Sequence, residues 1–152
     1  MQTAAQSLGR IRHWLQDEDV LPAISLAGCN LQGLHLSKLS FRGADLSGAE
    51  LQGAHLSQAK LQGANLSAAN FDDVTRITTA TLRGAMVILV DFTNVPQIAD
   101  HVSDIFGDGS VTLPEGCARP DHWPEETLNF QDFRTQWRAW QRSIGQDPDN
   151  PE

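Results

Sequence analysis

The sequence repeats itself every five residues, and this period limits the folds open to the chain more than any other feature. Leucine or phenylalanine occupies every fifth position from Leu26 to Phe71, and the residue two places earlier is alanine from Ala44 to Ala69. A period of five matches neither the turn of a helix nor the alternation of a strand. It fits a chain that turns a corner once in every unit. The repeat therefore predicts a solenoid with the leucines and alanines pointing inward.

The register of the repeat changes once. Six residues separate Phe71 from Ile77, where five are expected, and the period then continues to Phe92, which gives 14 units in all. We expect the additional residue to be expelled at a corner, as a bulge or small loop around residues 72–75. The coils on either side should remain stacked, because the inward pattern resumes in phase.

The pattern resembles the pentapeptide-repeat family, whose consensus is Ala-(Asp/Asn)-Leu-x-x. Units such as Ala44-Asp45-Leu46 and Ala64-Asn65-Leu66 match it, and the resemblance covers Ile24 to about Phe92. It implies an all-β solenoid core, a right-handed quadrilateral β-helix with four units per coil and about 3.5 coils. Each leucine buried in such a ladder stabilises the stack by about 1.5–3 kcal/mol.

The segments that flank the repeats have other patterns, and we divide the chain into residues 1–23, 24–95 and 96–152. In the first segment, the apolar positions of residues 3–16 share one helical face. This spacing predicts an N-terminal helix that caps the first coil, whose edge would otherwise be unpaired.

The last segment is predicted to be mainly helical and to pack on the last coil. We expect a short helix at Gln97–Phe106 and a longer one from about Phe130 to Ile144. Asn129 is the candidate N-cap of the longer helix, and Gly145 follows its end. Residues 146–152 are expected to fray.

The formal charge of −8 is unevenly distributed. The units from Ile24 to Phe92 contain five acidic and five basic residues, whereas the residues after Phe92 carry a net charge of −7. Phosphate binding needs a basic patch, so nucleic acid is not an expected partner. No apolar run approaches the roughly 18 residues of a membrane helix. We therefore expect a cytoplasmic protein that does not bind membranes.

Two histidines occupy the outward position before a leucine and lie one expected coil apart. Because His35 and His55 are separated by 20 residues, their rings should stack on one face of the solenoid. Such a pair could bind a metal or respond to pH. No third ligand is evident beside them, and we favour the interpretation that both are solvated surface residues.

Catalytic and cofactor motifs are not evident in the sequence, and we expect neither an enzyme nor a cofactor or metal. Cys29 occupies an inward position and is interpreted as a buried structural thiol. Cys117, His122 and Glu125 lie close together in the sequence, but such proximity does not establish a catalytic geometry.

Aromatic residues gather on one face of the predicted last helix, at Phe130, Phe133, Trp137 and Trp140. The last coil carries apolar outward residues at Met86, Ile88 and Leu89, which need a cover. We favour packing of the aromatic face on the chain's own coils. A homodimer through this helix, or a groove on a partner, is the alternative.

These features together predict a non-enzymatic protein that acts as an interaction or scaffold module for an unidentified protein partner. The candidate interaction surface comprises Phe130, Phe133, Trp137, Trp140, His35 and His55. The alternative, implied by the family resemblance, is a DNA-mimicking modulator of DNA gyrase or topoisomerase. The short and electrically neutral repeat segment disfavours that alternative.

Overall fold

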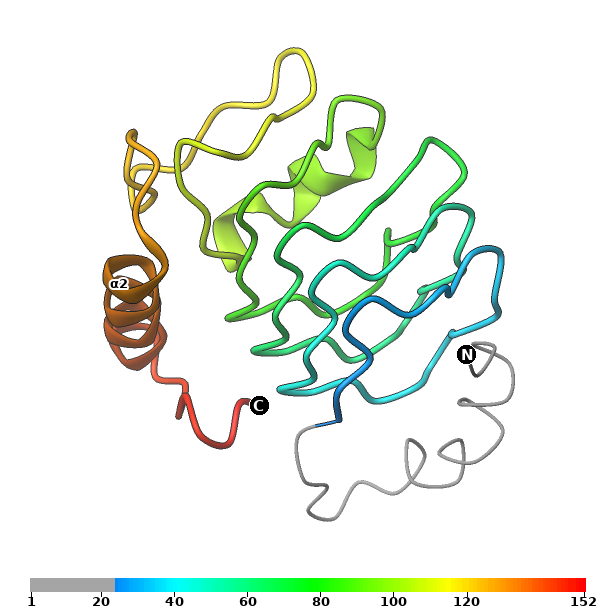
Figure 1. Ribbon diagram of the computed structural model, residues 1–152, viewed down its shortest axis with the longest axis horizontal. Coiled ribbons are helices and arrows are strands. Elements are labelled where there is room, and N and C mark those ends of the chain that lie inside the picture. Colours follow the sequence, from blue (N-terminus) through cyan, green and yellow to red (C-terminus); the bar gives the residue numbers. More distant parts are fainter. Residues whose placement is uncertain (1–23) are drawn as a thin grey trace.

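The computed structural model describes residues 24–152, in which the chain winds into a stack of coils (Figure 1). Each coil contains four five-residue units, because residues 20 positions apart pair by parallel bridges, as Ser25 does with Asp45 and Asp45 with Asn65. Each unit contributes one bridging residue, so the repeats form a solenoid of single-residue bridges. The capping helix predicted in residues 1–23 lies outside the described residues.

A tight turn closes most units and explains the preference for glycine at the fifth position. In the first described unit, the amide of Cys29 donates to the carbonyl of Leu26 at 3.1 Å, and Gly28 between them has a φ of 67°. A positive φ at the third residue of a turn is the conformation that glycine adopts without strain. Lys38 and Gln58 adopt the same conformation, so the turn alone does not require glycine.

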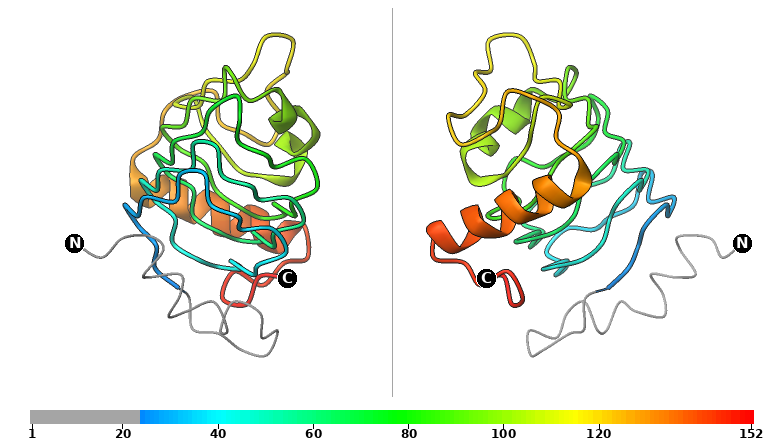
Figure 2. Two further views of the ribbon diagram at one scale, coloured as in Figure 1. Left: turned by 90° about the vertical axis from the view of Figure 1, so that its right-hand side faces the viewer. Right: turned by 60° about the vertical axis from the view of Figure 1, so that its left-hand side comes forward.

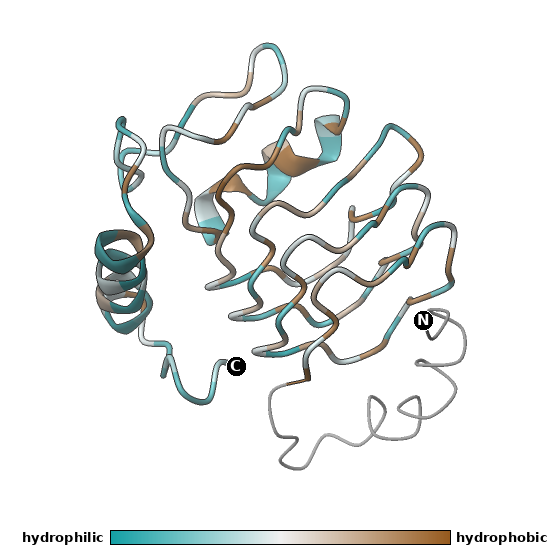
Figure 3. Ribbon diagram, viewed as in Figure 1, coloured by the Kyte–Doolittle hydropathy of each residue, from teal (hydrophilic) through white to brown (hydrophobic). Residues whose placement is uncertain are grey.

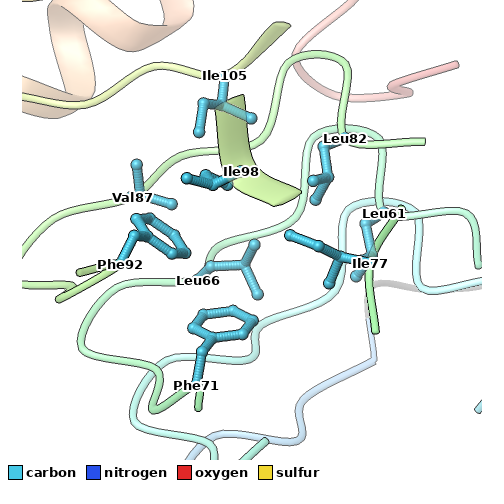
Figure 4. Close-up of a pocket in the computed structure, with 9 residues that line it drawn as sticks. All are labelled: Leu61, Leu66, Phe71, Ile77, Leu82, Val87, Phe92, Ile98 and Ile105. Atoms are coloured by element: carbon cyan, nitrogen blue, oxygen red, sulfur yellow. The ribbon is translucent and has the colours of Figure 1, made fainter. Parts of the chain in front are cut away.

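The interior of the solenoid is a continuous column of apolar side chains, which confirms the predicted inward positions. Leu31, Leu51 and Leu56 are each at most 1% exposed, and Ala49 and Ala54 are fully buried. Near the last coils the column leaves a small gap lined only by aliphatic and phenylalanine side chains, among them Phe71, Ile77 and Phe92 (Figure 4). With no polar group in its wall, this gap is a packing defect and offers nothing to orient a ligand.

The register change forms a corner loop, as predicted. The carboxylate Oδ1 of Asp72 accepts hydrogen bonds from the amides of Val74 and Thr75 and from the amide of Gly53 on the coil below. The coils on either side stay stacked, with the bridge spacing increased to 21 residues between His55 and Arg76.

Backbone pairing continues past residue 95, so the stack is taller than the repeats predict. Met86 bridges to Phe106, and Asp91 bridges to Thr112. Between Asp91 and Phe106 the chain forms two short 3-10 helices, η2 (Pro96–Asp100) and η3 (Val102–Asp104). The sequence predicts a single helix at residues 97–106. Ile98 and Ile105 of this segment are buried in the solenoid core.

A single α-helix, α2 (Phe130–Ser143), lies against the side of the stack in the described part of the chain (Figure 2). It begins as predicted, because the side chain of Asn129 accepts a hydrogen bond from the amide of Asp132 at 3.0 Å. The loop before it is held by Asp108, a buried residue whose carboxylate accepts from the amides of Ser110 and Leu128.

The residues after α2 are packed, and the prediction that residues 146–152 fray is wrong. Gln146 is 3% exposed, and its side-chain amide donates to the carbonyl of Arg83 at 2.9 Å. Pro151 is also buried. Among residues 24–152, no helix is long and apolar enough to cross a membrane.

Candidate interaction surface

The four units of a coil divide the outward side chains among four faces, each read from its bridges. The first face carries Ser25, Asp45, Asn65, Met86 and Phe106; the second carries Asn30, Glu50, Asn70, Asp91 and Thr112; the third carries His35, His55 and Arg76; the fourth carries Ser40, Lys60 and Thr81. Hydropathy alternates along each coil between the buried leucines and these outward residues (Figure 3). The faces are therefore the parts of the repeats whose chemistry is independent of the core.

Charge is separated between the faces, although the repeats are electrically neutral as a whole. The five acidic residues of the repeats, Asp45, Glu50, Asp72, Asp73 and Asp91, belong to units of the first and second faces. The five basic residues, Lys38, Arg42, Lys60, Arg76 and Arg83, belong to units of the third and fourth faces. The solenoid therefore has an acidic side and a basic side.

The third face brings the two predicted histidines together. The ring centroids of His35 and His55 lie 4.5 Å apart with the planes at 70°. His35 is exposed and His55 is half-buried. In residues 24–152, no three His, Cys, Asp or Glu side chains gather to hold a metal ion.

Arg76 continues the histidine column, and the sequence reasoning missed it. It bridges to His55 one coil further on and is exposed. The inserted residue after Phe71 moves Arg76 to a spacing of 21 residues from His55, so a search at a spacing of 20 does not find it. Counting units instead of residues would have found it.

The carboxylates on the second face are engaged by their neighbours. Hydrogen bonds from the hydroxyl and the amide of Thr93 lower the pKa of Asp91 below its usual range. Burial acts to raise the pKa of Asp72, but the hydrogen bonds from Gly53, Thr75 and Val74 together outweigh it and lower that pKa. Both groups are therefore stabilised in the charged form.

The aromatic face of α2 covers the upper part of the first face. Phe133 is fully buried against Met86 and Phe106, and the ring centroids of Phe106 and Phe133 are 5.2 Å apart. The indole Nε1 of Trp137 donates to the carbonyl of Gly84 at 2.8 Å. The apolar outward residues of the last coil are thus partly covered by the chain itself, while Leu89 remains 66% exposed.

Most of the predicted aromatic surface is consequently occupied within the chain. Phe133 is removed from the candidate interaction surface because it has no exposed area. Trp140 is half-buried and stacks on His122, with centroids 4.9 Å apart and parallel planes. Of the four aromatic residues, Phe130 is the exposed one, at 56%.

The segment after α2 covers the corner between the fourth and first faces. A Cβ atom added to Gly63 would collide with Pro151, and one added to Gly84 would collide with Gln146. The guanidinium of Arg83 donates to the carbonyls of Ile144 and Glu152. The helix α2 and the residues after it therefore occupy the first face and this corner, and the exposed bridging residues Asn30, His35 and Arg76 of the second and third faces lie outside their contacts.

The residues considered for catalysis have separate structural surroundings. The ring Nε2 of His122 lies 2.8 Å from the carbonyl oxygen of Ile105, and the ring stacks on Trp140. Burial raises the pKa of the Cys117 thiol, which disfavours the reactive thiolate. Cys29 is half-buried and packs against the core.

Comparison with known proteins agrees with the repeat geometry. A stack of five-residue units, paired every 20 or 21 residues, defines the class as a repeat solenoid. A family model described as pentapeptide repeats matches eight copies in residues 24–63 and 49–95. Residues 24–95 of the chain are therefore pentapeptide repeats. No curated protein sequence matches the chain.

Several solved structures are similar to this chain. A pentapeptide repeat protein from the thylakoid lumen of Arabidopsis thaliana is 18% identical, with 82% of this chain and 74% of that chain covered and a TM-score of 0.42. A pentapeptide repeat protein from Nostoc is 21% identical, with 75% of this chain and 87% of that chain covered and a TM-score of 0.42. A plasmid-mediated fluoroquinolone resistance protein is 12% identical, with 76% and 63% covered and a TM-score of 0.23. At such scores, none of these similarities supports an inference about function.

Proposed function

We propose that this protein is a non-enzymatic interaction module, in which the coils form a rigid scaffold for a protein partner. One observation carries the proposal: several side chains on the second and third faces are exposed and play no part in the core, while α2 and the residues after it cover other parts of the stack. Exposed ladder residues on these two faces include Asn30, His35 and Arg76. Rigid surfaces bind at a lower entropic cost than mobile ones, which favours this use.

The finer geometry implied by the family, a right-handed quadrilateral β-helix, suits this function. Four flat faces would then present four independent columns of side chains at strand spacing, about 4.8 Å apart. Changes in an outward column leave the leucine ladder intact, so a binding surface can be altered without unfolding the scaffold.

Modulation of DNA gyrase by imitation of DNA is the competing function, and the charge distribution does not favour it. A DNA mimic needs acidic side chains at regular intervals along a long surface. On the second face, Glu50 and Asp91 alternate with the amides of Asn30 and Asn70. We expect the protein to leave supercoiling by gyrase unchanged, and inhibition at sub-stoichiometric protein would establish the competing function instead.

Site-specific photo-crosslinking in the intact chain tests the interaction module. A photoreactive amino acid at Thr78, an exposed residue of a third-face unit, should capture a partner protein that is then purified and shown to bind directly. The matched control carries the same group at Gln136, an exposed residue of α2. Equal crosslinking from both positions, or turnover of a small molecule without a partner, would contradict the proposal.

A further inference from the structure

The third face and its corner with the fourth face form a basic surface, although the repeats have no net charge as a whole. We define this basic surface as His35, Lys38, His55 and Arg76. The bridges place His35, His55 and Arg76 on three successive coils, and Lys38 lies at the corner that follows Leu36. His35, Lys38 and Arg76 are exposed. Gln97 and His101 contact this face at Ile77 and Thr78, beside Arg76, and leave the three exposed side chains of the surface available to a partner.

We propose that this basic surface binds a short acidic segment of a partner protein. The proposal rests on the proposed function, because it names the chemistry of the partner that the scaffold would hold. The surface presents one column of hydrogen-bond donors, which consists of the two imidazoles and the guanidinium. The hydroxyls of Ser37 and Thr78 beside this column already donate within the chain, to the carbonyl of His55 and to Oε1 of Gln97.

This combination of groups suits carboxylates. A guanidinium donates through several N–H groups at once, and charged donors make the stronger hydrogen bonds to carboxylates. Three bridged levels span about 10 Å, at roughly 4.8 Å between levels. An extended peptide advances about 3.3 Å per residue, so three or four residues cover the surface and can present two carboxylates to it.

A nucleic acid is a poorer occupant of the same surface. Its affinity comes mainly from the number of phosphates that are neutralised. The basic surface offers few cations, and a strand longer than the surface would continue toward a tail with a net charge of −7. The acidic protein segment needs only local contacts, so we favour it.

Acidification should strengthen the proposed contact. Histidine is the side chain that gains positive charge between about pH 8 and pH 5, and the glutamates of a partner remain ionised above about pH 4.3. The charged groups near the histidine pair are Arg76 and Lys38 on the same surface and Lys60 on the fourth face. Toward the second face they are Glu50, Asp72 and Asp73. Added imidazole charge would raise the positive potential that a carboxylate meets.

A labelled hexaglutamate peptide and the intact chain provide the test, with fluorescence anisotropy at low ionic strength. We expect saturable binding that is tighter at about pH 6 than at about pH 8. Replacement of one exposed charge, Arg76→Gln, should weaken binding about fivefold. His35→Gln should remove part of the pH dependence. The matched control, Arg134→Gln, removes the same charge from an exposed position on α2 and should change the affinity by less than about twofold.

Three results would overturn the proposal. They are absence of peptide binding by the folded chain, equal loss in Arg76→Gln and Arg134→Gln, and tighter binding of a single-stranded oligonucleotide by the same surface. Circular dichroism of each variant establishes that it is folded. One outcome separates the two proposals: the peptide does not bind, but the photoreactive group at Thr78 still crosslinks a partner, and Arg76→Gln does not weaken binding of that partner. In that case the interaction function stands and the proposed acidic chemistry of the partner is wrong. If no partner crosslinks and the peptide fails, both are wrong.

Discussion

Residues at the same position of the repeat have different contacts and different burial in different coils of the stack. At the fifth position of a unit, Lys38 and Gln58 adopt a positive φ without glycine. At Gly63 the absence of a side chain also makes room for Pro151. The outward position likewise holds an exposed Arg76 on one coil and a buried Met86 two units later.

The leucine ladder gives the first prediction at this scale. Leu56→Ala should lower the free energy of unfolding by about 2–5 kcal/mol, because it leaves a cavity among buried side chains. Thr81→Ala, at an exposed outward position, should change it by less than about 0.5 kcal/mol. Chemical denaturation measures both. Similar losses at the two positions would contradict the inward and outward assignment.

The corner at Asp72 gives a prediction of pH dependence. Because its pKa in the folded chain lies below the ordinary value of 3.8, the carboxylate stabilises the fold at higher pH. That contribution should be lost as the pH falls below about 4 and through the folded-state pKa. Denaturation in urea at a series of pH values should show a smaller acid-induced loss in Asp72→Asn than in the native chain.

The neighbouring Asp73→Asn is the control for this measurement. Asp73 is exposed and lies in the same corner, so its replacement removes the same charge. An identical change in acid sensitivity in both variants would mean that general charge, not the hydrogen bonds to Asp72, controls the stability of the corner.

At the scale of elements, α2 is fixed to the coils by polar contacts as much as by its aromatic face. Trp137 and Gln146 both donate to backbone carbonyls at the same corner of the stack, those of Gly84 and Arg83. Gln141 of α2 in turn donates to Gln146 at 2.9 Å. Because hydrogen bonds require defined distances and angles, these contacts set the position of the helix along the first face.

A glycine substitution tests this docking. Gly63→Ala should destabilise the chain by about 1–3 kcal/mol more than Gly33→Ala, because the added methyl group overpacks against Pro151. Gly33 has nearly the same φ, 66° against 65°, but open space around it. The backbone strain of the two variants is therefore matched. Limited proteolysis should release the residues after α2 in Gly63→Ala alone, and equal release in both would contradict the assigned contact.

At the scale of the whole molecule, the tail completes the solenoid. Its first part adds Ile98, Ile105 and Val111 to the core, and α2 covers Met86 and Phe106 on the side. An aromatic face that is used within the chain leaves little apolar area for self-association. We therefore predict that the intact protein is a monomer of 16.6 kDa in light scattering.

Truncation separates this prediction from a dimer formed by the tail. A chain that ends at Val95 loses the cover of its last coil and should aggregate or unfold at a lower temperature. A chain that ends at Asn129 keeps the last coil and loses only α2 and the residues beyond it, so its defect should be smaller. A well-behaved monomer after truncation at Val95, together with an intact chain of twice 16.6 kDa, would show that the tail serves dimerisation.

Features whose signals are local could be predicted from the amino-acid sequence. The five-residue period identified the buried leucines, the added residue after Phe71 predicted the corner loop, and Asn129 marked the beginning of α2. These signals could be read because a solenoid repeats one short interaction, and because a helix cap depends on residues within one turn of each other.

Features that depend on contacts between residues far apart in the sequence could be found only in the folded chain. Trp137 meets Gly84 across 53 positions, and Gln146 meets Arg83 across 63, so no local pattern could show that the residues after α2 are packed. The separation of charge is of the same kind. Composition makes the repeats neutral, but winding the chain at four units per coil brings the acidic and basic residues to different sides, because each coil places equivalent units on the same face.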